Sequence, residues 1–203
     1  MKLKDDGTVN TVKRIDSDDL TDGLIAGDQF GTSVSQIGDV NGDGVGDIAV
    51  GAVGVDQPGL LDTGAVYILM LNANGTVKSD TSIEEGFVET LFGQSVTGLG
   101  DLDGDGTPDL AVGAPSDSTF GTDAGLIWTY FLNANGSVKS SRKTTAGDGL
   151  PTQANSQLGY SLANLGDING DGITDIAVGA PEYTENGKKT GITMVLFLEE
   201  TGA

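Results

Sequence analysis

Short apolar runs alternate with polar, glycine-rich stretches along the whole chain, and none of the runs keeps the 3.6-residue period of an amphipathic helix. The first set of four segments lies near residues 30–37, 47–53, 64–71 and 76–83. Its second and third segments are apolar at nearly every position, which is typical of strands covered on both faces. We therefore predict β-strands throughout and essentially no helix.

The same set of segments occurs three times. The stretch GDVNGDGVGDIAVGA at residues 38–52 recurs as GDLDGDGTPDLAVGAP at 100–115 and as GDINGDGITDIAVGAP at 166–181. Each copy follows a similar phrase (FGTSVSQI, FGQSVTGL or LGYSLANL) and precedes an apolar run (GAVYILMLN, GLIWTYFLN or GITMVLFLE). Asn-Gly pairs at 74–75 and 135–136 separate the third and fourth segments and predict hairpins.

A further repeated segment shows where the repeats begin and end relative to the chain termini. LNANGTVKSDTSI at residues 71–83 recurs as LNANGSVKSSRKT at 132–144, and LKDDGTVNTVKRI at 3–15 aligns with both without a gap, with Asp6-Gly7 at the turn. The sequence therefore starts with the end of one unit and stops just before the end of another. Three units are present, circularly shifted by one strand.

Four-stranded units of this length, buried on both faces, predict the blades of a β-propeller. A β-solenoid, whose repeats are usually roughly 20–30 residues, and a string of small sandwiches are the alternatives. The circular shift favours the propeller, because the last blade of a closed ring is often completed by a strand from the other terminus. We predict one all-β half-propeller domain over residues 1–203, made of an outer strand in 1–15, blade 1 at 30–83, blade 2 at 92–144 and blade 3, lacking its outer strand, at 158–198.

The charge balance narrows the function. Thirty Asp and Glu residues face ten Lys and Arg, for a formal charge of −20, which argues against nucleic acid and anionic membranes as partners. Cysteine and histidine are absent, so disulfides, thiolate metal sites and cysteine nucleophiles are excluded, and the commonest general base is missing. Six basic residues fall in the predicted fourth strands, either as guards against edge pairing or as ordinary solvated charge: Lys13, Arg14, Lys78, Lys139, Arg142 and Lys143.

No apolar stretch approaches 18 residues, and no charged-then-apolar leader opens the chain. We expect no membrane insertion. We also expect an extracellular or cell-surface location, with a secretion signal removed or the chain excised from something longer.

The repeated acidic loops carry the candidate chemistry. Asp39-x-Asn41-x-Asp43 continues with a glycine at position 6 and an aspartate at position 9, and the carbonyl at position 7 adds another oxygen. Calcium takes six to eight hard oxygen ligands, and a loop that turns around the ion delivers alternate side chains to it. We therefore expect about three Ca²⁺ per chain. The predicted ligands are Asp39, Asn41, Asp43, Val45 and Asp47, then Asp101, Asp103, Asp105, Thr107 and Asp109, then Asp167, Asn169, Asp171, Ile173 and Asp175, of which Val45, Thr107 and Ile173 offer carbonyls.

Other readings of these loops are weaker. Magnesium demands tighter octahedral geometry and gives up water reluctantly. An EF-hand would carry Glu at position 12, where this chain has Val50, Val112 and Val178. Asp, Asn and Gly also form Asx-turns without any metal, but the recurrence of one ligand set in three copies favours calcium.

Phe30-Gly31 with Gly51-Ala52, and the corresponding phrases FG with GAP at 92–93 and 113–115 and LG with GAP at 158–159 and 179–181, resemble FG-GAP repeats. Such repeats build the β-propeller of integrin alpha subunits and occur in many bacterial surface proteins. The resemblance covers nearly the whole chain. It implies one blade per repeat, with the Asp-rich loop joining the first two strands of the blade and holding Ca²⁺. Val53 replaces the proline in the first unit and Leu158 the phenylalanine in the third, and integrin alpha propellers have seven blades where this chain encodes three.

The expected function is that of a calcium-binding, integrin-alpha-like module that serves as an extracellular adhesion or protein/glycan-binding scaffold and is not an enzyme. The polar constellations recur in every unit, which suits a scaffold. One alternative is a carbohydrate-active enzyme, a polysaccharide lyase or glycosidase, that uses a carboxylate pair. Its acids would be drawn from Glu84, Glu85, Glu89, Asp117, Asp123, Glu182 and Glu185. A purely structural segment of a larger surface protein is the other alternative.

Two further features bear on partners. Trp128 and Tyr130 in a predicted third strand form either a sugar-stacking platform or packing between blades. Three blades would each have to span about 120° to close a ring, whereas propellers have four to eight blades. We therefore expect two chains to form a six-bladed ring by exchanging the strand at residues 8–15, with a monomeric arc cut from a larger propeller as the alternative.

Overall fold

The structure, a computed structural model, describes residues 2–3, 8–87 and 89–199. Within these residues the chain is all-β, apart from two single-turn 3-10 helices, η1 (Ser17–Asp19) and η2 (Ala146–Asp148). This confirms the predicted fold class at the level of strands and antiparallel sheets. No helix in the described part of the chain is long and apolar enough to cross a membrane.

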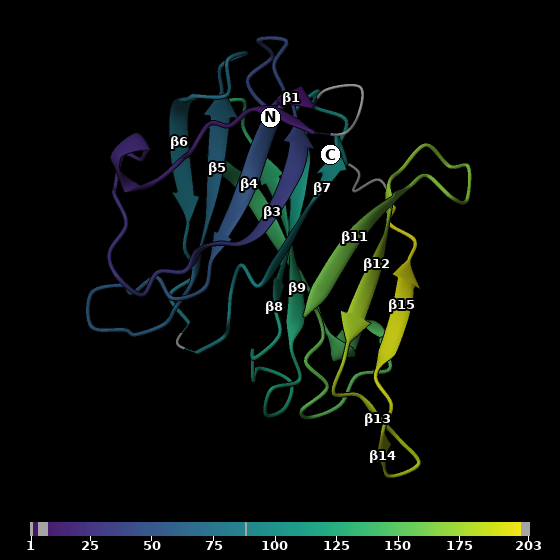
Figure 1. Cartoon of the computed structure of the whole chain (residues 1–203). Coiled ribbons are helices and arrows are strands. Elements are labelled where there is room, and N and C mark those ends of the chain that lie inside the picture. The colour runs from purple at the N-terminus through teal and green to yellow at the C-terminus, as the bar shows by residue number, and fades with distance from the viewer. Residues whose placement is uncertain (1, 4–7, 88, 200–203) are drawn as a thin grey trace.

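Three antiparallel sheets follow one another along the chain, and Figure 1 shows the second sheet between the other two. The first sheet consists, in spatial order, of β3 (Phe30–Gly38), β4 (Asp47–Ala52), β5 (Ala65–Leu71) and β6 (Val77–Ile83). The second consists of β7 (Ser95–Gly100), β8 (Asp109–Ala114), β9 (Leu126–Leu132) and β10 (Val138–Thr144). The third has three described strands, β11 (Ser161–Gly166), β12 (Asp175–Ala180) and β15 (Ile192–Leu196), and the short hairpin β13 (Thr184–Glu185) and β14 (Lys188–Lys189) precedes β15.

The sheets pack face to face through two apolar cores. Ile37, Ile68 and Met70 of the first sheet join Val96 and Tyr130 of the second in one buried cluster. A second cluster places Leu99 and Phe131 of the second sheet against Ile176 and Val178 of the third. Every residue of β8 and β9 is buried, because the second sheet has a neighbour on each face. Trp128 and Tyr130 lie in the first cluster, so their place is in the packing between sheets.

The repeated Phe-Gly and Gly-Ala phrases meet at these interfaces. The carbonyl of Gly93, from the second sheet, accepts a hydrogen bond of 2.7 Å from Ser33 Oγ of the first. A Cβ on Gly51 would lie 2.0 Å from that carbonyl oxygen, and Gly64 forms a parallel bridge with Phe92. We call the recess formed by Ser33, Gly51 and Gly64 the docking notch of the first sheet.

The second sheet has the same notch, formed by Ser95, Gly113 and Gly125. It receives Leu158-Gly159 of the third sheet, with Ser95 Oγ 2.7 Å from the Gly159 carbonyl oxygen. A Cβ on Gly113 would lie 1.9 Å from the same oxygen. Leu158 and Phe92 are both fully buried, so leucine serves in place of phenylalanine. The two phrases of the repeat are therefore the two halves of one contact between successive sheets.

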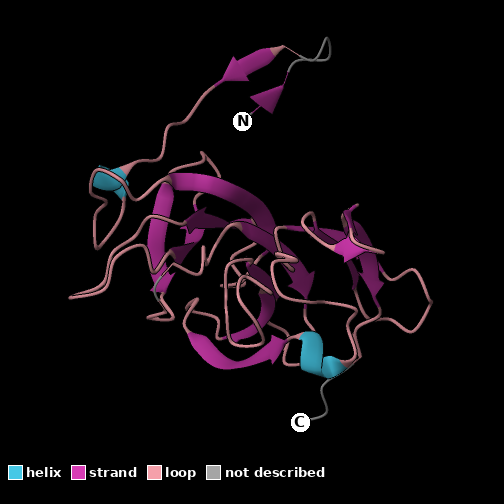
Figure 2. Cartoon of the chain, turned by 90° about the horizontal axis from the view of Figure 1, so that it is seen from below, coloured by secondary structure: helices cyan, strands magenta, loops and turns pink. Residues whose placement is uncertain are grey.

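An N-terminal hairpin of β1 (Lys2–Leu3) and β2 (Val9–Thr11) lies apart from the three sheets (Figure 2). Leu3 pairs with Val9, and the register then shifts, as it does beside Leu71–Val77 and Leu132–Val138 in the outer hairpins of the first two sheets. The expected Asp6-Gly7 turn lies outside the described residues. In the single chain β2 pairs with β1, and completion of a blade by residues 1–15 stays a prediction.

Candidate metal centre

Three acidic loops join the first and second strands of each sheet, and all the predicted ligand positions lie in them. The ninth-position aspartates Asp47, Asp109 and Asp175 are the first residues of β4, β8 and β12. Each set of predicted ligands therefore lies in one loop at one end of its own sheet. Among the described residues, three carboxylates lie within 4.8 Å of one another in the second loop, those of Asp101, Asp103 and Asp109, and not in the first or third.

Hydrogen bonds from the backbone shape each loop. In the second loop Asp105 N–H donates to Asp101 Oδ1 at 3.0 Å, and Gly106 N–H donates to Asp101 Oδ2 at 2.8 Å. Thr107 N–H donates to Asp105 Oδ1 at 2.8 Å. The first and third loops contain the same bonds at the corresponding positions. The sharp turn needs a positive φ at Gly104 (75°) and Gly106 (91°), which glycine adopts without strain.

The bond from Thr107 N–H to Asp105 is an Asx-turn, as the sequence allowed, whereas the two bonds to Asp101 span four and five residues. The amide donors orient the carboxylates, but they do not neutralise them. Ten of the 30 Asp and Glu residues are in the three loops. A cation is the natural partner for side chains that are held so close together.

The ninth-position aspartate has a second role that the sequence reasoning missed. Asp109 is buried and accepts Leu102 N–H at 2.8 Å and Leu132 N–H at 3.1 Å, so it ties its loop to the end of β9. Asp47 makes the same bonds to Val40 and Leu71, and Asp175 makes them to Ile168 and Leu198. Burial raises the pKa of Asp109 to about 6. The leucine that recurs at the end of the third strand of each repeat was the sequence signal for this second bond of the aspartate.

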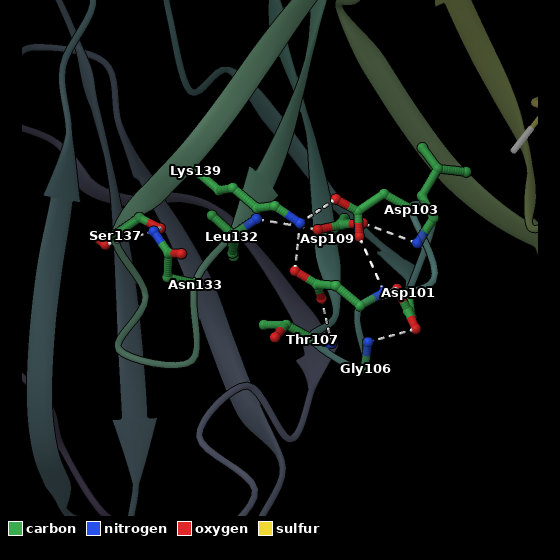
Figure 3. A network of polar contacts seen from close by, with 11 residues as sticks. Asp101, Asp103, Gly106, Thr107, Asp109, Leu132, Asn133, Ser137 and Lys139 are labelled. Carbon is green, nitrogen blue, oxygen red and sulfur yellow. Dashed lines mark hydrogen bonds and ion pairs between the residues drawn. The ribbon is translucent and has the colours of Figure 1, made fainter. Parts of the chain in front are cut away.

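The second loop passes a geometric test for a bound cation. Carboxylate oxygens of Asp101, Asp103 and Asp109 all lie within 4.8 Å of one another. Calcium–oxygen distances are about 2.3–2.6 Å, so ligands on opposite sides of one ion lie at most about 5 Å apart. The three carboxylates therefore fit around a single ion, and Figure 3 shows them converging with Lys139 beside them.

A lysine from the fourth strand reaches into each of the first two loops. Lys139 Nζ lies 2.7 Å from Asp103 Oδ2 and 2.7 Å from Asp105 Oδ2 (Figure 3). Lys78 Nζ lies 2.7 Å from Asp43 Oδ2 in the first loop. These ammonium groups lower the pKa of Asp105 and of Asp43. In the third loop the amide of Asn169 donates to Asp171 at 2.8 Å.

The lysine contacts were not foreseen from the sequence, which suggested only edge protection for these residues. Lys78 and Lys139 each follow the valine that opens the fourth strand, and Asn10 takes the aligned position in the N-terminal phrase. A lysine at the same position of two repeats was therefore the sequence signal for these contacts. The sequence does not show which loop lies opposite that position.

Three of the seven unrepeated acids named for a catalytic pair have partners within the fold. Tyr130 Oη donates to Glu85 Oε1 at 2.6 Å, and buried Asp117 accepts Thr119 N–H at 2.8 Å. Glu182 forms an ion pair with Lys189 in the third unit. Each of these three acids thus has a structural partner.

Comparison with known proteins agrees with the repeat. The FG-GAP repeat family matches residues 30–69, 92–130 and 158–193. The chain is 37% identical over 168 residues to phosphatidylinositol-glycan-specific phospholipase D of Bos taurus, a match that covers 78% of this chain and 19% of that protein. It is 34% identical over 163 residues to integrin alpha-6 of Homo sapiens, covering 79% and 13%. It is also 37% identical over 163 residues to integrin alpha-PS2 of Drosophila melanogaster, covering 76% and 12%.

The chain thus spans about a fifth or less of the length of these relatives. The family match itself covers more than half of the chain and places one repeat on each sheet. The resemblance seen in the Phe-Gly and Gly-Ala-Pro phrases is confirmed. The chain belongs to the FG-GAP repeat family.

Proposed function

We propose that this chain is a calcium-binding, integrin-alpha-like β-propeller module that holds about three Ca²⁺ and serves as an extracellular scaffold for adhesion or for binding proteins or glycans. The observation that carries the proposal is the convergence of Asp101, Asp103 and Asp109 in a loop whose hydrogen-bond pattern recurs in all three repeats. A bound ion would supply positive charge that rigidifies the loop. The module is proposed to bind partners, without catalysis of its own.

Each ligand position has a distinct task in this proposal. The carboxylate at position 1 is oriented by two backbone N–H groups, as Asp101 is by Asp105 and Gly106. The aspartate at position 5 lies on the exposed side of the loop. The buried aspartate at position 9 connects the loop to the third strand, so any ion held there also braces the sheet. Millimolar calcium outside cells suits open surface loops of modest affinity.

The stoichiometry tests the metal assignment. Isothermal titration calorimetry with Ca²⁺ is expected to give about three sites for the unaltered chain and one fewer for Asp105→Ala. Asp105 is the right choice because it is exposed at the loop surface, whereas removal of Asp109 would also break the tie to β9. Thr107→Ala is the matched control, since its carbonyl and not its hydroxyl is the proposed ligand. An unchanged stoichiometry in Asp105→Ala would contradict the assignment.

Lys139 supplies a second test. Because its ammonium lies 2.7 Å from two proposed ligands, it competes with the ion for their oxygens. Lys139→Met is expected to tighten calcium binding at one site by several-fold, up to about tenfold, which corresponds to about 1.4 kcal/mol. Lys143→Met removes the same charge from the same strand, but the Lys143 Nζ lies over the rings of Phe87 and Trp128. Calorimetry that shows equal affinity in both variants would rule out direct competition.

The binding role can be tested by an array of glycans and extracellular-matrix proteins, probed with the labelled chain in millimolar Ca²⁺ and in EDTA. The proposal expects captured ligands whose signal falls when calcium is removed. An array without any signal above background in calcium would count against a scaffold for adhesion.

A further inference from the structure

The third sheet has a docking notch of its own, and this notch is open to solvent. Ser161, Gly179 and Gly191 occupy the repeat positions of Ser33, Gly51 and Gly64. They line a pocket of about 420 Å³ together with Ile192 and Thr193. The three described atoms nearest to a Cβ on Gly179 all belong to Ser161, whereas a Cβ on Gly51 or Gly113 meets the carbonyl of the next repeat.

The face of the third sheet beside this notch is also uncovered. Leu165, Val195 and Phe197 are 38%, 46% and 58% exposed. Their repeat equivalents in the first sheet, Ile37, Ile68 and Met70, are at most 2% exposed because they pack against the second sheet. The exposed side chains are therefore an interface face of the repeat.

The chain carries one unused counterpart of the notch. Phe92-Gly93 and Leu158-Gly159 dock into the first and second notches. Phe30-Gly31 opens the first sheet, and in the described part of the chain no atom beyond its two neighbours lies within 4 Å of where a Cβ on Gly31 would be. At the equivalent glycines in the docked pairs, a Cβ would lie 2.7 Å from the Ala65 carbonyl oxygen and 2.6 Å from that of Leu126. Phe30 packs against Tyr67 of its own sheet, and Ile15 and Leu20 cover part of this face. Val34 of the same strand is nevertheless 61% exposed.

We propose that the open notch of the third sheet binds Phe30-Gly31 of a second copy of this chain, and that the reciprocal contact closes a two-chain ring of six sheets. Serine 161 would donate its hydroxyl hydrogen to the Gly31 carbonyl of the partner copy, as Ser33 and Ser95 donate within the chain. The contact joins the notch of one copy to the Phe30-Gly31 dipeptide of another, which are two different surfaces. Two copies therefore form a closed ring only if each chain spans half of it. Six sheets fall within the range of four to eight found in propellers.

The N-terminal segment of the same partner copy can supply the fourth strand that the third sheet lacks beside β15 in the described part of the chain. The side chain of Lys13 lies 3.6 Å from where a Cβ on Gly75 would be, in the outer turn of the first sheet. Thr81 lies 3.5 Å from the corresponding position of Gly136 in the second sheet. Lys13 and Thr81 hold the same position in the repeated phrase. Lys13 therefore lies beside the first sheet as Thr81 lies beside the second, and Ile15 packs on the same sheet. The segment at residues 8–15 can follow the path of the fourth strand of a preceding sheet and pair with β15 of a second copy once β2 leaves β1.

The mass of the unaltered chain in solution is the first test. Light scattering in saturating calcium is expected to give about twice 20.6 kDa. A mass of one chain at concentrations up to the millimolar range would overturn the proposal. A ladder of larger masses that grows with concentration would overturn the closed ring, since it would mean that the contact repeats without closing.

Two glycine variants test the contact from its two sides. Gly179→Ala places a methyl group in the open notch, where the Ser161 hydroxyl can turn aside, and Gly31→Ala places one on the docking dipeptide. Both are expected to give folded chains, with the circular dichroism of the unaltered protein and the mass of one chain. The control Gly27→Ala has a positive φ like Gly31 and open space around it, and it is expected to stay dimeric. A dimer that persists in either notch variant would place the interface elsewhere.

Discussion

Unfolding in millimolar calcium is expected at a temperature well above that in EDTA. A ligand present at a hundred times its Kd stabilises the folded state by about 2.7 kcal/mol per site, so three sites contribute about 8 kcal/mol. For a chain of this length each kcal/mol moves the midpoint by about 2–4 °C, which gives a rise of about 15–30 °C. The physical reason is that the three loops hold ten carboxylates, of which lysine ammonium groups pair with three, and a bound cation offsets the repulsion among the rest.

Calorimetric or circular-dichroism melts at matched ionic strength measure this difference. Magnesium at the same concentration is the control, and it is expected to restore only a small part of the rise because it gives up its water reluctantly. Melting curves that coincide in calcium and EDTA would refute calcium binding at these loops. Equal effects of the two metals would instead mean that the loops select charge alone.

Gly113→Ala is expected to destabilise the chain by about 3 kcal/mol or more, at the upper end of the cost of overpacking. The added methyl carbon would lie 1.9 Å from the carbonyl oxygen of Gly159, so the second and third sheets must move apart. That movement would also stretch the 2.7 Å hydrogen bond from Ser95 Oγ. Chemical denaturation in calcium measures the loss, which corresponds to a fall of about 6–12 °C in the melting midpoint.

Two alanine variants provide the comparison for Gly113→Ala. Gly147→Ala, in η2, meets nothing closer than 3.4 Å and is expected to leave the free energy of unfolding nearly unchanged. Gly179→Ala alters the equivalent position in the third sheet, where no carbonyl of a following repeat lies against the glycine in the single chain. A large and equal loss in all three variants would show that glycine acts through chain flexibility, and not through the close approach of two sheets.

The strands of this protein could be predicted from the sequence because the same local pattern of apolar and polar residues occurs in all three repeats. The first sheet was expected at 30–37, 47–53, 64–71 and 76–83, and its strands begin and end within one residue of those positions. The acidic loops were equally accessible, since oxygen ligands at alternate positions need only a local turn. Both features depend on neighbours in sequence, and repetition removed the ambiguity of a single copy.

Contacts between segments far apart in the chain were not accessible in this way. Lys139 meets Asp103 and Asp105 across 34 to 36 residues, and only the folded sheet shows that β10 begins beside the loop. Asp109 was predicted as a ligand, but its tie to Leu132 requires β8 and β9 to be paired. The recurring leucine marks the position, but it does not say which carboxylate its N–H will meet until the pairing of the strands is known.

By itself the sequence determined the repeat, the all-β class, the acidic loops and the family, because these follow from local periodicity, turn chemistry and a phrase repeated in register. The tertiary structure alone decided why the phrase contains Phe-Gly and Gly-Ala. Gly51 and Gly113 lie in strands with ordinary backbone angles, and they must be glycine only because the carbonyl of the next repeat occupies the space of a Cβ. The structure likewise decided that one notch, at Gly179, faces solvent. Steric exclusion between segments that are distant in sequence exists only once the sheets have packed.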